Sequence, residues 1–416
     1  MRILDQCFAK EEVNTGRQPE IDLLKAFLII GMIFVHVYED CFESHGVLTD
    51  VICEYACVII GAASFMFCMG IGMQYSRRVN AKNMALRGLQ LLAIGQLLNL
   101  ARNVLPNMIA YAVYGGKWFL AEEMLVLQAD ILSLAGLTFF AMALLLKLKF
   151  TPGKILLVGT ILSIVALICN YTVTSPESYL ASQLLGFLII TKAESYFPFC
   201  SYFFFVAFGY YVGSWYRRLK DKDRACSYVL RVIVPICTVY YLIRFLVPMP
   251  FLPEVSSDLQ YNLQPFPDAI ATSLVSIILL VVFYKIGKVF FHGETPAAVR
   301  SISRNINRYY CTSYVIILPL QTIMVAVFGE LPEGDVLPFW VAVLICVACA
   351  LLIKAYDRTL AKTIQNRKPA VVLGMYAVYF ILTIVVLAYV YPKLDVYPNI
   401  WNNYLLDDLK GIGGML

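Results

Sequence analysis

Eleven apolar segments, each about 20 residues long, are the feature that most limits how this chain can fold. A helix of that length spans the hydrocarbon core of a bilayer. In lipid the backbone polar groups must be satisfied within the segment, which favours helices. The segments are residues 21–38, 51–75, 86–105, 129–147, 154–173, 197–216, 226–247, 268–291, 309–329, 336–356 and 369–391. The sequence therefore predicts an all-α polytopic membrane protein with about eleven transmembrane helices.

The composition excludes soluble classes of protein. Apolar residues make up 60% of the chain and charged residues 15%, whereas soluble domains have roughly 45–50% and about 25%. Despite the net charge of +5, the basic residues lie between the apolar runs rather than in one patch, so we expect no nucleic-acid partner. Most of the 12 cysteines lie inside apolar runs, where they act as small hydrophobes. We expect no metal, and pairing of Cys41 with Cys53 stays open.

The distribution of lysine and arginine predicts the orientation. When connections are assigned alternately to the two sides, one side holds 27 of the 33 basic residues. Cytoplasmic loops carry such an excess. We therefore expect a cytoplasmic N-terminus and an extracytoplasmic C-terminus, with tails at residues 1–20 and 392–416 of a single transmembrane domain, 1–416. Two half-apolar connections, 106–128 and 174–196, look interfacial or re-entrant.

The chain has three histidines, which narrows the search for a general base. His292 falls at a cytoplasmic helix end, and we expect no catalytic role for it. His36 ends the first predicted helix on the outer side, and His45 follows in a loop with four acids and no basic residue. Neighbouring carboxylates hold a histidine in one tautomer and make it more basic, as a general base requires. A solvated acidic loop is the alternative interpretation.

Lys25 lies on the same predicted helix as His36, with ten residues between them. At 1.5 Å per residue the two are about 16 Å apart along the axis, one near each membrane face. This spacing suits a substrate whose anionic part is held at the inner end while its reactive part reaches the imidazole. Alternatively, Lys25 is a snorkelling anchor, or it pairs with Asp22 one turn earlier.

The string RQPEIDLLKAFLIIGMIFVH resembles the opening of the integral-membrane acyltransferases. Those families begin with an acidic D-x-x-R-G/A element, and acyltransferase-3 proteins have an arginine, ten residues and then a histidine. Asp22, Lys25 and His36 occupy those positions here, with lysine in place of arginine. Lysine keeps the charge but lacks the bidentate fork.

Further motifs follow in the order of the same superfamily. ALRGLQLLAIGQLLNL followed by QADILSLAGLTFF resembles a helix pair of the heparan-glucosaminide N-acetyltransferase and YeiB-like branch. The other similar stretches are GAASFMFCMGIGMQYSRR, SYFPFCSYFFFVAFGYYVG and SISRNINRYYCTSYVIILPL. Together they span about three quarters of the chain.

This resemblance implies an acetyl-CoA-dependent O- or N-acyltransferase of the plasma membrane. It would move an acetyl group from cytoplasmic acyl-CoA to a hydroxyl or amine of an extracytoplasmic glycan or cell-wall acceptor. The catalytic histidine of acyltransferase-3 proteins corresponds to His36, and that of the other branch to the region of His45. We favour His36, because a helix holds an imidazole more rigidly than a loop does, with His45 as an acceptor-side partner.

The remaining site residues follow from the resemblance and from the rarity of polar side chains within membranes. The candidate contacts to the phosphates of the donor are Lys25, Arg77, Arg78, Lys82 and Arg87. The candidates for the acceptor cavity are Asp22, Glu39, Asp40, Glu54, Asn99, Arg102, Asp130 and Arg244. Outward snorkelling is the alternative for Arg244.

Two other classes of function compete with the acyltransferase. A transporter or flippase of a small or lipid-linked substrate would show inverted repeats and paired broken helices, and no such pairing is evident in the sequence. A catalytically dead acyltransferase-like receptor is disfavoured by the two outer histidines. The partners expected are the lipid bilayer, acyl-CoA and the acceptor, and the oligomeric state stays open, with a homodimer as one option.

Overall fold

The computed structural model is helical, and it describes most of the chain. The described residues are 6–43, 46, 49, 51–76, 80–115, 119, 128–174, 176, 179–191, 195–249, 251–255, 257–359, 361 and 368–390. Within them, β-pairing is limited to two isolated bridges, Phe8 with Leu219 and Ala129 with Ser195. The all-α prediction is confirmed.

Each of the eleven predicted segments coincides with a helix. The elements are α2 (Pro19–Cys41), η1 (Val51–Ala56), α4 (Cys57–Tyr75), α5 (Ala81–Asn99), η2 (Leu100–Val104), α6 (Leu105–Tyr114), α8 (Ile131–Lys147), α9 (Pro152–Thr172), α10 (Tyr179–Gly186), α11 (Phe199–Tyr216), α12 (Lys222–Leu246), α13 (Asp258–Leu263), α14 (Phe266–Phe290), α15 (Ala297–Arg304), α16 (Ile306–Phe328), α17 (Val336–Thr359) and α19 (Lys368–Val390). Over the described part of the chain, seven helices are long and apolar enough to cross a membrane. The multi-pass class follows, while the count of eleven and the orientation of the termini stay predictions.

The third predicted segment is longer than the sequence indicated. Residues predicted to stop at 105 continue through η2 and α6 as one helix of 34 residues, Ala81–Tyr114. Pro106 lies in the first turn of α6, directly after the π-helical turn of η2, and a proline there does not break the chain of hydrogen bonds as it would further in. The first part of the connection predicted as interfacial or re-entrant is therefore helical.

Close backbone packing fixes the wall behind the candidate site. A Cβ atom at Gly70 of α4 would clash with the carbonyl of Val206 on α11, and one at Gly209 would clash with Phe67. Gly88 of α5 and Gly136 of α8 approach each other in the same way. Small residues let membrane helices pack at backbone distance, so α4 packs closely on α11 and α5 packs closely on α8.

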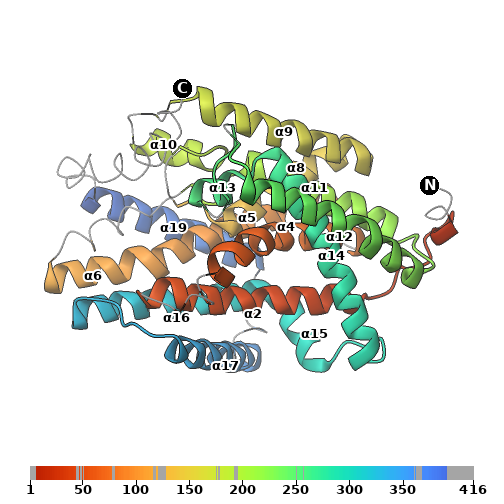
Figure 1. Ribbon diagram of the computed structural model, residues 1–416. Coiled ribbons are helices and arrows are strands. Elements are labelled where there is room, and N and C mark those ends of the chain that lie inside the picture. The colour runs from red at the N-terminus through yellow and green to blue at the C-terminus, as the bar shows by residue number, and fades with distance from the viewer. Residues whose placement is uncertain are drawn as a thin grey trace.

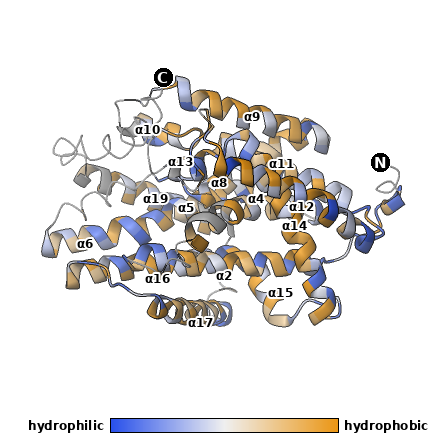
Figure 2. Ribbon diagram, in the orientation of Figure 1, coloured by the Kyte–Doolittle hydropathy of each residue, from blue (hydrophilic) through white to orange (hydrophobic). Residues whose placement is uncertain are grey.

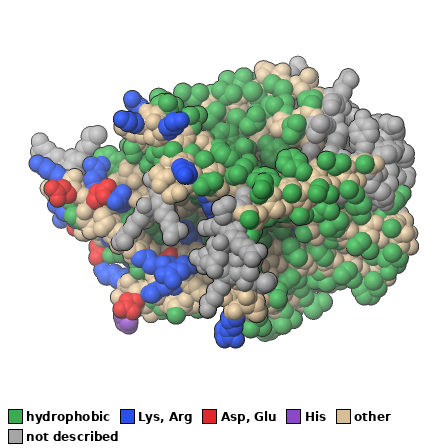
Figure 3. Space-filling model, turned by 180° about the vertical axis from the view of Figure 1, so that it is seen from behind, with side chains coloured by type: hydrophobic (Ala, Val, Ile, Leu, Met, Phe, Trp, Pro, Cys, Tyr) green, Lys and Arg blue, Asp and Glu red, His purple; other side chains and the backbone are tan. Residues whose placement is uncertain are grey.

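α2 lies at the centre of the remaining helices. It contacts α4, α14, α15, α16 and α17, and in Figure 1 it runs alongside α16 with α17 beneath and α15 at one end. Figure 2 shows apolar residues along most of α14 and α17. Seen from behind, charged side chains gather at one end of the molecule and apolar side chains cover most of the remaining visible face (Figure 3). The residues of α2 are thus placed where five helices meet.

An N-terminal strap, residues 6–18, folds onto the segment between α11 and α12. The backbone amides of Ala9 and Asn14 donate to Arg218 and Arg217 at 2.8 Å, and Lys220 donates to Cys7 at 2.9 Å. The predicted cytoplasmic tail is therefore ordered over the part that the structure describes, and α2 begins at Pro19, inside the predicted limits of that tail.

Candidate functional site

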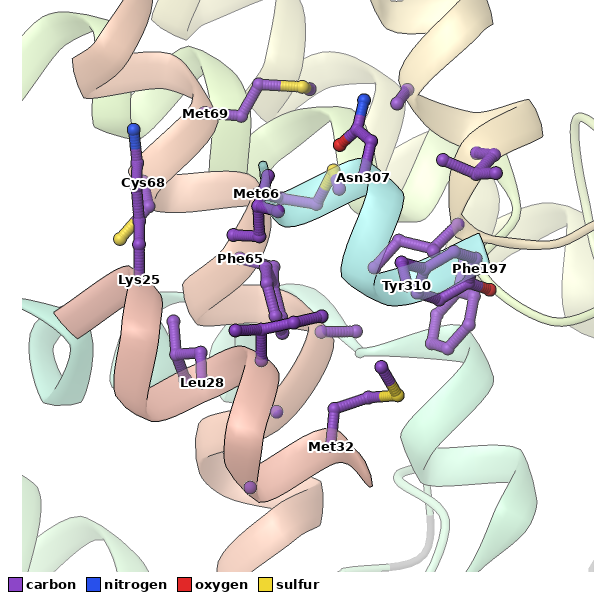
Figure 4. Close-up of a pocket in the computed structure, with 18 of the residues that line it drawn as sticks. Lys25, Leu28, Met32, Phe65, Met66, Cys68, Met69, Phe197, Asn307 and Tyr310 are labelled. Carbon is purple, nitrogen blue, oxygen red and sulfur yellow. The ribbon is translucent and has the colours of Figure 1, made fainter. Parts of the chain in front are cut away.

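A cavity of about 1280 Å³ runs along α2 and is bordered by η1, α4, α5, α8 and α16. Lys25 lines one end and His36 the other, separated by about 16 Å of helix. Between them the wall is apolar, and Figure 4 shows its labelled members, which include Leu28 and Met32 from α2 and Phe65 and Met69 from α4. The cavity thus joins a cationic end to an imidazole end through an apolar bore.

The cationic end holds two basic side chains, Lys25 and Arg87. Lys25 is half-buried and extends alongside Cys68 (Figure 4). Arg87 of α5 lines the same end. In the described part of the chain neither forms an ion pair. Asp22 instead accepts from Arg17 Nη2 at 2.9 Å and from Ser303 Oγ at 2.6 Å, so the alternative pairing of Asp22 with Lys25 is wrong.

The other predicted donor contacts are placed differently. Lys82 is exposed and does not line the cavity, although its neighbour Asn83 does. Arg77 and Arg78 lie outside the described residues. Of the five predicted cations, the structure therefore brings two to the cavity.

At the opposite end, His36 is held by a partner on each ring nitrogen. Its Nδ1 lies 3.1 Å from Asp40 Oδ2, and its Nε2 lies 2.6 Å from the Tyr314 hydroxyl. Because Asp40 can only accept when ionised, Nδ1 carries the proton and Nε2 accepts from Tyr314. The side chains of His36 and Asp40 remain 28% and 26% exposed. A carboxylate one turn along the helix thus orients the imidazole, and Tyr314, which lines the cavity, occupies the Nε2 lone pair.

A buried polar cluster lies behind Tyr314. The Arg102 guanidinium stacks on the Tyr314 ring, 4.5 Å from its centroid. Arg102 Nη2 donates to Asn99 Oδ1 and Gln128 Oε1 at 2.9 Å and lies 3.4 Å from Asp130 Oδ2. Asp130 also caps α8, accepting from the Leu132 and Ser133 amides. The cluster holds Tyr314 from the rear.

The cluster corrects one prediction. Asn99, Arg102 and Asp130 were expected to ring the cavity, but none of them lines it. Tyr310 and Tyr314 stand between, and the Tyr310 hydroxyl lies 3.4 Å from Asp130. Polar groups inside a membrane satisfy one another before they face an apolar space, which explains why they lie one layer back.

Four more predicted residues lie elsewhere or outside the description. Arg244 forms a buried pair with Asp268, with contacts of 2.9 and 3.0 Å, so it neither lines the cavity nor snorkels outward. Glu39 is exposed and does not line the cavity. His45 and the Glu54 side chain lie outside the described residues, so their roles stay predictions.

Sequence reasoning missed Tyr310 and Tyr314. Both line the cavity from α16, and Tyr261 of α13 lines it too. The signal was available, because two tyrosines four residues apart share one face of a helix. In the part of the chain that is described, no group of three or more His, Cys, Asp or Glu could hold a metal ion.

Comparison with known proteins identifies one family. The family model described as "Heparan-alpha-glucosaminide N-acetyltransferase, catalytic" matches residues 17–240, which is more than half of the chain. That range contains Lys25, His36, Arg87 and Arg102 and ends before Tyr314. No curated protein and no solved structure matches the chain. Of the branches that the sequence motifs resemble, the acyltransferase-3 and YeiB-like ones stay resemblances.

Proposed function

The chain belongs to the heparan-alpha-glucosaminide N-acetyltransferase catalytic family, and we propose that it moves an acetyl group from cytoplasmic acetyl-CoA to an extracytoplasmic acceptor. The acceptor group is a hydroxyl or amine of a glycan or cell-wall component. One observation carries the proposal: a single cavity connects Lys25 and Arg87 to the Asp40-oriented imidazole of His36.

The donor would enter with its phosphates at the cationic end. Charge-assisted hydrogen bonds from Lys25 and Arg87 suit phosphate oxygens. The bore beyond them is lined mainly by apolar side chains and would receive the thioester arm, with Met32 and Met69 as adaptable contacts. The thioester carbonyl would then lie near His36, about 16 Å further along α2.

His36 would act as the general base. As the acceptor hydroxyl or amine attacks the thioester carbonyl, its proton moves to Nε2 and Asp40 stabilises the resulting imidazolium. The tetrahedral intermediate collapses, the carbon–sulfur bond breaks, and the proton neutralises the leaving thiolate. In the alternative order, Nε2 attacks first and carries the acetyl group to the acceptor. Both routes require Tyr314 to release Nε2, after which its hydroxyl can donate to the carbonyl oxygen.

The test measures acetyl transfer from radiolabelled acetyl-CoA in inside-out and right-side-out vesicles. Only the orientation that exposes the cytoplasmic face should consume the donor. At equal membrane abundance, His36→Ala should lose about 10²–10⁴-fold in turnover. The control is His292→Asn, because His292 has a φ of 49° and asparagine tolerates that conformation. If His36→Ala keeps more than about a tenth of the activity, the general-base assignment is wrong.

We also propose a plasma-membrane location with the N-terminus inside and eleven spans. The excess of lysine and arginine on one side of the predicted spans supports this orientation. A C-terminal tag should then be labelled by an impermeant reagent from outside. A tag reached only from the cytoplasm would overturn the odd number of spans.

A further inference from the structure

The cavity borders α2 on two faces, not one. Lys25, Met32 and His36 lie along one face, because 3.6 residues make a turn. Phe27 and Gly31 lie on the other side of the helix and also line the cavity. The space therefore wraps around α2 and cannot be a closed tube between α2 and its neighbours.

Several of the lining residues are open to the surroundings of the protein. Phe27 is 48% exposed and Ile52 of η1 is 49% exposed. A Cβ atom placed on Gly31 would meet no atom within 4 Å. A side chain that both borders a cavity and is half exposed marks a place where the cavity opens. We call this opening the lateral window; its rim on α2 is Phe27, Gly31, Phe34 and Val35, and Ile52 of η1 and Ile60 of α4 line the same cavity.

The lateral window lies at the depth of the lipid tails. Along α2, Gly31 is about 9 Å from Lys25 and about 7.5 Å from His36. The rim side chains are all apolar, although an opening to water would favour polar ones. The window therefore connects the reaction chamber with the hydrocarbon of the bilayer, while the cationic end and the imidazole end remain polar.

A break in the neighbouring helix borders the window. Gly61 has φ −49° and ψ −111° inside α4, and the six residues of η1 before it form a π-helix. Below this point α4 packs at backbone distance against α11 through Gly70. The kink thus separates the closely packed part of α4 from its first turn, where Ile60 lines the cavity.

We propose that the acceptor is an amphiphile, with a polar headgroup that carries the reacting hydroxyl or amine and a hydrocarbon chain that lies in the lateral window. This inference rests on the proposed function. An acetyl group ends one carbon beyond the carbonyl and cannot reach a window about 7.5 Å along the helix. The donor arm fills the bore from the cationic end. The remaining occupant of an apolar side opening is the chain of the acceptor.

The first test compares dodecyl glucosaminide with methyl glucosaminide as acceptors, with the protein in lipid nanodiscs. Gly31→Leu places a side chain at the window, starting from a Cβ that meets no atom within 4 Å. It should lower kcat/KM for the dodecyl acceptor about tenfold or more and change that for the methyl acceptor less than about twofold. Gly153→Leu is the matched control, because a Cβ there also meets no atom within 4 Å and Gly153 does not line the cavity.

A second readout does not depend on turnover. Dodecyl glucosaminide with a diazirine in the middle of its chain should label peptides covering residues 27–35 and 51–60, and unlabelled dodecyl glucosaminide should reduce that labelling. Gly31→Leu should reduce it as well. Labelling spread equally over the exposed faces of α9 and α12, or equal loss of both acceptors in Gly31→Leu, overturns the amphiphilic acceptor. Competed labelling without any acetyl transfer overturns instead the proposed acetyltransferase.

Discussion

Two buried arginine–aspartate pairs lie within the helices, and they are built differently. Arg244 and Asp268 form a compact pair with two contacts of 2.9 and 3.0 Å, and Arg244 also donates to the carbonyl of Pro253. Arg102 lies 3.4 Å from Asp130 and spreads its contacts over two amide side chains and a tyrosine ring. All four charged residues are at most 5% exposed.

This difference shows that the presence of a buried charge does not by itself indicate a functional residue; its contacts decide. Arg244 and Asp268 neutralise each other and join α12 to α14. The Arg102 cluster leaves one face of its guanidinium to Tyr314, which in turn contacts His36. From the sequence both arginines were candidates for the cavity, with outward snorkelling as the alternative for Arg244, and of the two only the Arg102 cluster is connected to it through Tyr314.

Breaking either pair should have the largest effect on stability. Arg102→Ala and Arg244→Ala each leave a buried carboxylate unpaired, which costs about 3–5 kcal/mol in the free energy of unfolding. Thermal unfolding in detergent should show a lower Tm for both variants. A lower Tm for only one of the two variants would mean that the two pairs are not equally shielded from water.

Removing both charges of a pair should separate the two regions. Arg244→Met with Asp268→Asn should regain most of the stability and keep acetyl transfer, because no charge remains buried alone. Arg102→Met with Asp130→Asn should regain stability, since asparagine still caps α8, but lose turnover about tenfold because Tyr314 loses its cation. Equal turnover in the two double variants would reduce the Arg102 cluster to a structural role.

Lys25 extends the comparison to a cation that forms no ion pair with any carboxylate in the described part of the chain. Lys25→Ala should weaken acetyl-CoA binding about tenfold, since a charge-assisted contact is lost. Lys25→Arg should keep or strengthen binding through a bidentate phosphate contact. Equilibrium binding of labelled acetyl-CoA measures both, with the exposed Lys82→Ala as the control. Unchanged affinity in Lys25→Ala would make this residue a membrane anchor.

The smallest effect is expected from one hydroxyl group beside each arginine. Tyr314→Phe removes the hydrogen bond to His36 but keeps the ring on Arg102, so kcat should fall about two- to tenfold with little change in KM. Tyr240→Phe removes the hydroxyl that donates to Asp268 at 2.5 Å and should leave kcat unchanged. Steady-state kinetics decide, and equal kcat values would exclude Tyr314 from the reaction.

The helices were largely predictable because a single physical requirement fixes them. An apolar run long enough to span a bilayer must satisfy its own backbone, and each of the eleven runs is helical in the structure. The third predicted segment ended too early, at residue 105, whereas the helix continues to Tyr114. The helix continues because Pro106 directly follows the π-helical turn of residues 100–104. The periodicity of the sequence does not predict such a turn.

The two ends of the cavity were predictable for a similar reason, and its walls were not. Lys25 and His36 share one helix, so their separation follows from the rise per residue. Asp40 lies one turn beyond His36 and reaches it within the same helix. Tyr314 lies 278 positions further along the chain than His36. The position of Arg102 behind Tyr314 depends on contacts with Asp130 at the start of α8 and with α16. These contacts are set by packing between helices, which the order of residues does not encode locally.

The N-terminal strap has a consequence for the order in which the protein is assembled. α2 is synthesised early, but the strap that precedes it pairs with residues about 200 positions later; the Asn14–Tyr216 contact spans 202 positions. Its other neighbours, α14 to α17, are made later still. A nascent chain therefore holds Lys25 and His36 in lipid without their final shelter until the last third of synthesis. α2 is therefore completed by contacts with helices that are synthesised long after it.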